Sequence, residues 1–478
     1  MGVAGGRIDD AATGPEAAEL MALAVERAAE DAGSRTLLER AQWLAVPRGM
    51  WSYTDPGRLI ARRTGLGEVH TVLAEVGILQ QALINRACSL VAAGELEVAV
   101  IVGGEARYRE QQARIAGIEV VESTQRGDLP DEVLRPEQPL VTDVELATQL
   151  VSPVVGYATL ENALRYANGN SLEAHRREMG QLWERFNRVA LGNAHAWNRE
   201  RYSAEEIAEP GPGNRLLAFP YTKLLTSQWN VDQAGALIIS SAGTAAGLGI
   251  PRDRLVFLRS GTESNHMVPV PSRRELHRCP GAQIAGRRAA ELAGIRIDDI
   301  DHLELYSCFP AAVQIYAREL GIALEGPLTV TGGMTFAGGP LNNFVFQAMA
   351  EMARVLRGDP RSVGLVSSVS VTLTKQGFGI WSCTPSGHVA AVADVSAEVE
   401  QRTAVAEVVP NSDSWGTVAG YTVTYDRDGP ELGVVVADLP DGTRTVATTT
   451  APGLMADMVD REFCGEKVRL LPDGTFSA

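Results

Sequence analysis

A chain of 478 residues, of which 45% are apolar, has room for roughly three domains of about 150 residues and for a sizeable core. Its formal charge of −16 argues against nucleic acid or an anionic membrane surface as the main partner, and its five widely spaced cysteines, with no C-x-x-C pair, argue against a zinc knuckle or a disulfide scaffold. No apolar run approaches the ~20 residues that span a bilayer, and no secretory leader is recognised, so the sequence predicts a cytoplasmic protein.

The beginning of the chain alternates between helix and strand patterns, which predicts an α/β architecture. Apolar residues recur at three- and four-residue spacing over Pro15–Gly33 and again over Gly77–Ala93. Two continuous apolar runs, Trp43–Pro47 and Val98–Val102, indicate buried strands. Continuous apolar strands between helices are typical of a sheet that is covered on both faces.

The same order of elements returns later in the chain. The segments Ala24–Gly33 and Ala285–Gly294 share seven of ten residues at an offset of 261, and the helix-ending glycines Gly94 and Gly358 lie 264 positions apart. We interpret two matches at nearly one offset as an internal duplication. The helices that carry the two ten-residue segments are therefore expected in equivalent buried positions between two sheets.

Two segments do not follow this pattern. The polar and largely helical stretch Tyr157–Glu200 concentrates aromatic and basic side chains, and both a solvated helical insertion and a lid over a ligand site remain open as interpretations. After about residue 390, apolar and polar residues alternate, and three Asp-Gly dipeptides supply turn signals between short strands. This pattern predicts a small β-barrel or an open sheet at the end of the chain.

Four motifs follow one another along the chain, and their order is more informative than any one of them: AAGELEVAVIVGGEA (Ala92–Ala106), NVDQAGALIISS (Asn230–Ser241), LELYSCF (Leu303–Phe309) and GGMTFAGGP (Gly332–Pro340). Together they resemble the thiolase superfamily. The third is similar to the H-D-C-F loop of sterol-carrier-protein-type thiolases, and the fourth is similar to the G-G-x-x-x-x-G-H-P loop. The resemblance covers most of Pro15–Thr384.

The likeness is to thiolase-like proteins, related to acetyl-CoA acetyltransferase, that carry an additional C-terminal β-domain. It implies a duplicated five-layered α/β fold with thiolase-like halves at 1–150 and 216–389, a helical insertion or lid at 151–215, and a C-terminal OB-like β-barrel at 390–478. It also implies lipid metabolism, an acyl-CoA or acyl-carrier thioester as partner, and CoA or a phosphopantetheine thioester as substrate. No metal and no tightly bound cofactor are expected, and a homodimer stays open.

The positions that carry the superfamily's chemistry are substituted. Thiolases place a thiolate at a helix N-terminus, where backbone N–H groups and the helix dipole lower its pKa, and the family spacing puts Gly77 at that position. The histidine of the G-H-P loop falls at Gly339, and the second cysteine falls near Ser368. The histidine and aspartate of H-D-C-F fall at Tyr306 and Ser307. Glycine has no side chain, so covalent acylation at Gly77 is excluded.

The remaining polar residues of these loops define a different candidate site. We expect Tyr306 to serve as a general acid or hydrogen-bond donor, Cys308 to place a thiol at the edge of the site, and Asn343 with Asn342 to polarise a thioester carbonyl. A buried core thiol, a hydrogen-bonded tyrosine and a helix N-cap are the structural alternatives. The catalytic candidates are Tyr306, Cys308 and Asn343, and the substrate-binding candidates are Gly77, Ser307, Gly339, Asn342, Ser368, Lys375 and Gln376.

Three functions follow from this pattern and remain open. The first is an enzyme that acts on acyl-CoA or carrier-bound acyl thioesters without the thiolase cysteine, by acyl transfer or by cleavage or formation of a carbon–carbon bond. The second is a non-catalytic protein that binds CoA or an acyl thioester, or serves as a scaffold. The third is an active thiolase in which another cysteine has taken over.

Overall fold

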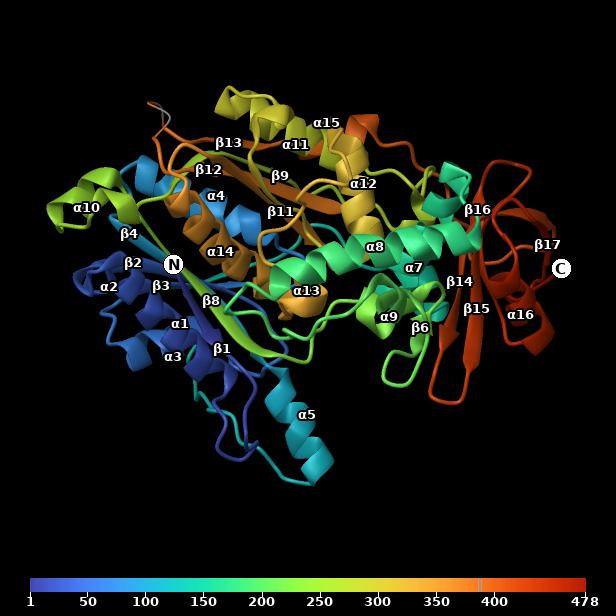
Figure 1. Ribbon diagram of the computed structural model, residues 1–478, viewed down its shortest axis with the longest axis horizontal. Coiled ribbons are helices and arrows are strands. Elements are labelled where there is room, and N and C mark those ends of the chain that lie inside the picture. Colours follow the sequence, from blue (N-terminus) through green and yellow to red (C-terminus); the bar gives the residue numbers. More distant parts are fainter. Residues whose placement is uncertain (386, 388) are drawn as a thin grey trace.

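The computed structural model describes residues 1–385, 387 and 389–478 and contains three sheets (Figure 1). The first sheet has the strand order β1-β8-β4-β2-β3-β5. Strands β4, β2, β3 and β5 run parallel, and β8 pairs antiparallel with both β4 and β1. Its strands are β1 (Gly2–Gly5), β2 (Ala41–Pro47), β3 (His70–Ala74), β4 (Val98–Ala106), β5 (Glu132–Leu134) and β8 (Asp232–Ser240).

The second sheet has the strand order β10-β11-β12-β9-β13. Its strands are β9 (Phe257–Ser264), β10 (His302–Glu304), β11 (Val363–Ser370), β12 (Lys375–Ser382) and β13 (Ala391–Asp394). The run β9-β12-β11-β10 repeats the run β1-β8-β4-β2 in order and in direction, because each consists of two antiparallel pairs followed by a parallel pair. The internal duplication expected from the sequence is visible in this topology.

Helices cover both sheets and fill the space between them, which gives five layers. Helices α1 (Ala17–Ala32) and α3 (Pro56–Thr64) cover the first sheet, α4 (Gln80–Ala92) and α14 (Phe344–Gly358) lie between the sheets, and α11 (Pro280–Ala293) covers the second sheet with α12 (Pro310–Leu320) beside it. The remaining helices are α2 (Thr36–Glu39), α5 (Arg107–Ala116), α6 (Asp143–Ala147), α7 (Pro153–Asn168), α8 (Leu172–Ala190), α9 (Ala204–Ala208), α10 (Ala242–Gly247), α13 (Gly333–Phe336), α15 (Ser396–Arg402) and α16 (Pro452–Asp460). Short 3₁₀ turns occupy Lys223–Leu225, Arg252–Arg254, Val270–Ser272, Ile297–Asp299 and Leu341–Asn343.

The prediction that the two duplicated helices lie between the sheets is wrong. Helices α1 and α11 occupy equivalent positions, but each lies on the outer face of its sheet and not between the sheets. The physical reason is visible in α1, which exposes Glu19, Arg27 and Glu30 to solvent. A helix between two sheets must bury opposite sides, as α14 does with Phe344, Val345 and Phe346 at its start.

The helical segment after residue 151 is not a solvated insertion. In α7, eleven consecutive residues from Val155 to Arg165 are buried, and the helix packs against β14 (Trp415–Tyr425) of the third sheet and against α12. Asn162 donates to the backbone carbonyl oxygens of Phe219 and Tyr421. In Figure 1, α7, α8 and α9 lie between the two core sheets and the C-terminal strands. This segment therefore joins the core to the C-terminal sheet.

The third sheet stands at one end of the molecule and is open, so the expected C-terminal barrel is not confirmed (Figure 1). Its path β16-β15-β14-β17-β18 ends at β16 and β18, and within the described residues one β-bridge between Thr448 and Thr475 joins the two ends. Strand β18 is two residues long, which is too short for a ladder that would close the sheet. The strands are β6 (Leu216–Ala218), β7 (Tyr221–Thr222), β14, β15 (Pro430–Asp438), β16 (Arg444–Thr449), β17 (Lys467–Leu470) and β18 (Phe476–Ser477).

The helices of the described residues are also informative about membranes. None of them combines the length and the apolar composition that a membrane-spanning helix requires.

Candidate functional site

The position expected for the thiolase nucleophile is filled by another part of the chain. Gly77 lies in the turn between β3 and α4 with φ of +100°, and an ideal Cβ at this residue would lie 2.6 Å from Cδ2 of Leu140. The carbonyl oxygen of Gly77 accepts a hydrogen bond of 3.0 Å from Nζ of Lys375. Because Leu140 occupies the volume that a side chain at Gly77 would need, no nucleophile fits there without rearrangement.

The position of the thiolase histidine is filled in the same way. Gly339 follows α13, and an ideal Cβ there would lie 2.1 Å from Oγ of Ser227 and 3.2 Å from Cε of Met334. An imidazole at Gly339 would therefore displace both side chains. The position that the family spacing assigns to the general base therefore has no free space for an imidazole.

The Tyr306-Ser307-Cys308 loop, between β10 and α12, is buried and tied to its surroundings. The backbone N–H of Tyr306 donates to Oγ of Ser367 at 2.8 Å, and the tyrosine ring meets Phe344 edge-on with centroids 6.0 Å apart. Oγ of Ser307 accepts from the backbone N–H of Met334 at 3.1 Å, which links this loop to the glycine loop.

Both reactive side chains of this loop are held in their protonated forms. Burial raises the pKa of the Cys308 thiol to about 12. Burial also raises the pKa of Tyr306 well above its ordinary value. The loop therefore offers a phenol that donates a hydrogen bond and a thiol, rather than a thiolate nucleophile.

Glu304, which the sequence analysis did not single out, holds the glycine loop in place. Its Oε2 accepts from the backbone N–H groups of Val330 and Thr331 at 2.8 and 2.9 Å and from the hydroxyl of Thr329 at 3.0 Å. Burial raises the pKa of this carboxyl group to about 7. In the sequence Glu304 lies between Leu303 and Leu305, and no motif marks it as a functional residue.

The two asparagines serve the backbone and do not cap α14. Nδ2 of Asn342 donates to the carbonyl oxygen of Arg48 at 2.8 Å, and Nδ2 of Asn343 donates to the carbonyl oxygen of Pro340 at 2.8 Å. The N–H of Val345, in the first turn of α14, instead donates to Oε1 of Gln80 at 2.8 Å. Gln80 is the first residue of α4, so the two helices of the central layer meet through this side chain.

The remaining candidates lie on β11 and β12. Ser368 is fully buried, and its hydroxyl has no hydrogen-bond partner among the described residues. Nε2 of Gln376 donates to Sγ of Cys279 at 3.1 Å, and its Oε1 accepts from the hydroxyl of Tyr316. Lys375 is 2% exposed, and desolvation lowers the pKa of its amine below the ordinary lysine value.

The candidates thus fall into two groups. Tyr306, Ser307, Cys308 and Gly339 meet in one tightly packed centre, and none of the five cavities described in the protein is lined by any of them. Lys375, the partner of the Gly77 carbonyl, instead lines a cavity of about 700 Å³ on the side of α4, which we call the α4 cavity. Its lining also includes Ile78, Asn85, Arg86, Glu263 and His266.

A polar chain that the sequence analysis missed borders the α4 cavity. Nε2 of Gln81 donates to Oδ1 of Asn85 at 2.8 Å, and Nδ2 of Asn85 donates to Oε2 of Glu263 at 2.9 Å. Burial raises the pKa of Glu263. Two amides at i and i+4 on a predicted buried helix were the signal that could have revealed this chain.

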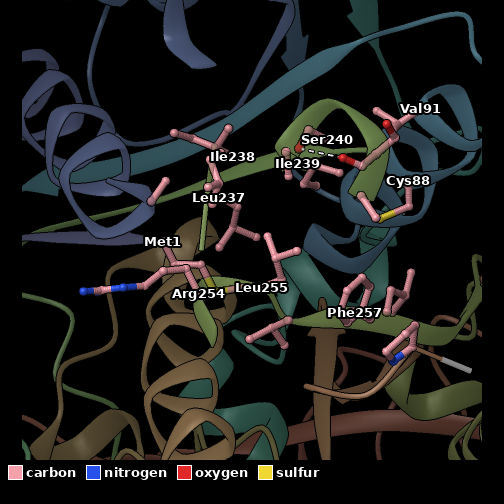
Figure 2. Close-up of a pocket in the computed structure, with 18 of the residues that line it drawn as sticks. Met1, Cys88, Val91, Leu237, Ile238, Ile239, Ser240, Arg254, Leu255 and Phe257 are labelled. Carbon is pink, nitrogen blue, oxygen red and sulfur yellow. Dashed lines mark hydrogen bonds between the residues drawn. The ribbon is translucent and has the colours of Figure 1, made fainter. Parts of the chain in front are cut away.

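A second cavity, of about 570 Å³, lies at the other end of α4 (Figure 2). There Cys88 and Val91 face Ile239 and the end of β8, and Leu255 and Phe257 border the opposite side. Burial raises the pKa of the Cys88 thiol to about 12. Its lining is therefore mainly apolar, and it includes the protonated thiol of Cys88 and the N-terminal residue Met1.

Comparisons with known proteins agree with this architecture. The family model described as "Thiolase-like protein type 1 additional C-terminal domain" matches residues 394–475. The 3-oxoadipyl-CoA/3-oxo-5,6-dehydrosuberyl-CoA thiolase of Escherichia coli K12 is 37% identical over 115 residues, which cover 23% of this chain. The chain spans about a quarter of the length of that relative (25%).

Two solved structures extend the similarity to most of the chain. A monomeric SCP2-thiolase like protein type 1 from Mycobacterium smegmatis has a TM-score of 0.84 at 27% identity and covers 99% of this chain and 97% of its own. The Ltp2–ChsH2(DUF35) aldolase has a TM-score of 0.60 at 19% identity and covers 80% and 97%, which shows a shared fold alone. The mixed α/β core with an appended C-terminal sheet is the arrangement that these comparisons support.

Proposed function

We propose that this chain, which is similar to thiolase-like proteins with an additional C-terminal domain, binds an acyl-CoA or carrier-bound acyl thioester without forming an acyl-enzyme at a cysteine. The observation that carries this proposal is the packing of Leu140 against Gly77, which leaves no free space for a side chain at the position that the family spacing assigns to the nucleophile. CoA or a phosphopantetheine arm is the ligand, and binding or a scaffold role is the function. The relationship to thiolases that act on acyl-CoA supports the ligand.

The chemistry of the remaining cysteine supports the same proposal. A thiolate is the nucleophile in thiolysis, so its population limits the rate of acylation. Because burial raises the pKa of Cys308 far above neutral pH, its thiol stays protonated at pH 7. A thiolase that uses Cys308 in place of the missing cysteine is therefore disfavoured.

A second candidate function is catalysis without a cysteine, by acyl transfer or by cleavage or formation of a carbon–carbon bond. The specific observation in its favour is Tyr306, which stands at the histidine position of the H-D-C-F loop and stays protonated at neutral pH. A phenol in that place can donate a proton or a hydrogen bond to a substrate oxygen, with Asn343 next to its ring partner Phe344.

Calorimetry and a turnover assay test the two functions together. We expect CoA and acetyl-CoA at millimolar concentration to give a binding isotherm and to raise the melting temperature. A panel of β-hydroxyacyl-CoA esters should be bound and recovered unchanged. Absence of heat and of a thermal shift for every ester would contradict thioester binding. If the wild-type protein turned over an ester and Tyr306→Phe did not, catalysis without a cysteine would be the function in place of binding alone.

A further inference from the structure

Lysine is rare in this protein, and one of its lysines is buried. Of the 43 basic residues, only Lys223, Lys375 and Lys467 are lysine, and the others are arginine. Lys223 and Lys467 are exposed, whereas Lys375 is 2% exposed. An arginine side chain stays charged at any relevant pH, whereas a buried lysine can lose its proton and become a nucleophile. Lys375 is therefore the basic side chain at the α4 cavity that can supply a neutral amine.

The surroundings of Lys375 favour the neutral amine. Within the described part of the chain, Nζ forms no ion pair and donates to the carbonyl oxygen of Gly77 at 3.0 Å. Desolvation lowers the pKa of the amine, and the charge of Glu137 opposes this shift. A neutral amine can keep its hydrogen bond to the Gly77 carbonyl and still present a lone pair.

The α4 cavity places a carboxyl group on the same side of the sheet as this amine. In the antiparallel pair of β12 and β9, Gly377 stands opposite Glu263, and Lys375 lies two residues from Gly377, so both side chains project from one face. The bond from Asn85 to Glu263 identifies that face as the one that α4 covers. Burial raises the pKa of Glu263, so the carboxyl group holds a proton more readily than an exposed one.

The size and the charge of the cavity define the class of ligand. A volume of about 700 Å³ lies within the ~300–1,000 Å³ of small-molecule sites. The charged residues of its lining are Arg86, Arg135, Glu137, Glu263, Asp394 and Glu400. Burial lowers the pKa of the nearby His266, which favours its neutral form. Two arginines against four carboxyl groups disfavour an anionic ligand, and they are compatible with an uncharged aldehyde or ketone.

We propose that Lys375 is an amine nucleophile that forms an imine with the carbonyl carbon of an aldehyde or ketone bound in the α4 cavity, with Glu263 as the proton donor and acceptor. The inference goes beyond thioester binding and does not depend on it. It also uses a different place in the fold from the packed centre around Tyr306 and Cys308.

The reaction balances without an oxidant or a reductant. The lone pair of Nζ attacks the carbonyl carbon, and a proton moves from nitrogen to oxygen to give a carbinolamine. The carboxyl group of Glu263 then gives a proton to the hydroxyl, which leaves as water while the carbon–nitrogen double bond forms. The remaining proton on nitrogen returns to the Glu263 carboxylate. The products are the imine and one molecule of water.

Reductive trapping of the full chain tests the proposal. The protein is incubated with propanal, hexanal or acetone and sodium cyanoborohydride at pH 7, and peptide mapping measures alkylation at each of the three lysines. An exposed lysine with a pKa of about 10.4 is neutral in fewer than one molecule in 10³ at this pH. We expect alkylation at Lys375 to exceed that at Lys223 and Lys467 at least about tenfold. The proposal would be overturned if, for all three carbonyl compounds, Lys375 were alkylated no more than Lys223 and Lys467.

Two variants separate chemistry from simple accessibility. Glu263→Gln should slow alkylation at Lys375 by about tenfold or more, because the amide gives no proton to the leaving hydroxyl. Glu137→Gln, at the exposed rim of the cavity, should speed it up a few-fold, because its charge no longer favours the ammonium form. Alkylation at Lys223 serves as the internal standard. If the alkylation rate at Lys375 were unchanged in both variants, the roles of Lys375 as nucleophile and Glu263 as proton donor would be contradicted.

Discussion

Two regions that meet at the start of α4 differ in how their space is filled. The thiolase centre that the family spacing predicts has no free space at two of its positions, because Leu140 fills the place of a side chain at Gly77 and Ser227 fills the place of one at Gly339. The α4 cavity beside it keeps about 700 Å³ of open volume next to Lys375. Side chains from other segments therefore pack against these two glycines, while polar groups lie next to an open cavity. The comparison predicts that restoring side chains destabilises the centre.

The largest effect is expected for Gly339→His. A histidine at this position must displace Ser227 and Met334, so we expect the free energy of unfolding to fall by about 3 kcal/mol in urea titration. Gly67→His is the matched control, because Gly67 is exposed and has no atom near its Cβ position. The control should change stability by less than about 0.5 kcal/mol. Equal stability of the two variants would show that the centre has room for the base.

The next effect concerns pH and Glu304. The folded-state pKa of about 7 lies above the ordinary value of 4.5, so between these values the folded protein binds a proton that the unfolded chain releases. The free energy of unfolding should therefore fall as pH rises from 4.5 to 7, by about 2–3 kcal/mol from this group. Glu304→Gln should remove that part of the slope in urea titrations across this window. If the free energy of unfolding fell equally steeply with pH in the wild type and in Glu304→Gln, Glu304 would not be the group that titrates in this window.

A smaller loss is expected for Gly77→Cys. The new side chain meets Leu140 and also requires a non-glycine residue at φ of +100°, so we expect a loss of about 2 kcal/mol. Gly117→Cys shares a positive φ of +67° but has open space around its Cβ position, and it isolates the backbone cost. Adding Leu140→Ala should recover about 1 kcal/mol for Gly77→Cys and none for Gly117→Cys. If Gly77→Cys and Gly117→Cys lowered the free energy of unfolding equally, Leu140 would not contribute to the cost at Gly77.

The smallest effect concerns the contact between the central helices. Gln80→Leu leaves the buried N–H of Val345 without an acceptor and should lower the free energy of unfolding by about 1 kcal/mol. Gln42→Leu is the matched control, because Gln42 accepts from the backbone N–H of Glu97 at an exposed position where water replaces it. Equal stability of both variants would show that Gln80 does not hold α14 in place.

Much of the fold could be predicted from the sequence because its signals are local or repeated. The shared residues of Ala24–Gly33 and Ala285–Gly294 reveal the duplication, which the topology of the two core sheets displays. Periodicity shows that a helix has an apolar face, but it does not show which layer that face meets, so α1 and α11 were placed between the sheets in error. The alternating tail predicted strands, whereas closure into a barrel depends on the length of β18.

The site was predictable only in part, because its decisive contacts join distant residues. Family spacing locates Gly77 and Gly339, but that Leu140 and Ser227 fill the adjoining space depends on how the loops pack. The bond from Lys375 to Gly77 spans 298 positions, which no local pattern encodes. Glu263 escaped notice because a lone carboxyl group on a strand carries no motif.

The central claim, that this thiolase-like centre is closed to covalent acyl chemistry, is tested most directly by mass spectrometry of the wild-type protein. The protein is incubated with acetyl-CoA, its intact mass is measured, and peptides that contain each of the five cysteines are mapped. The account predicts no acetyl thioester on any cysteine, Cys308 included. One acetyl group per chain on Cys308 would contradict it.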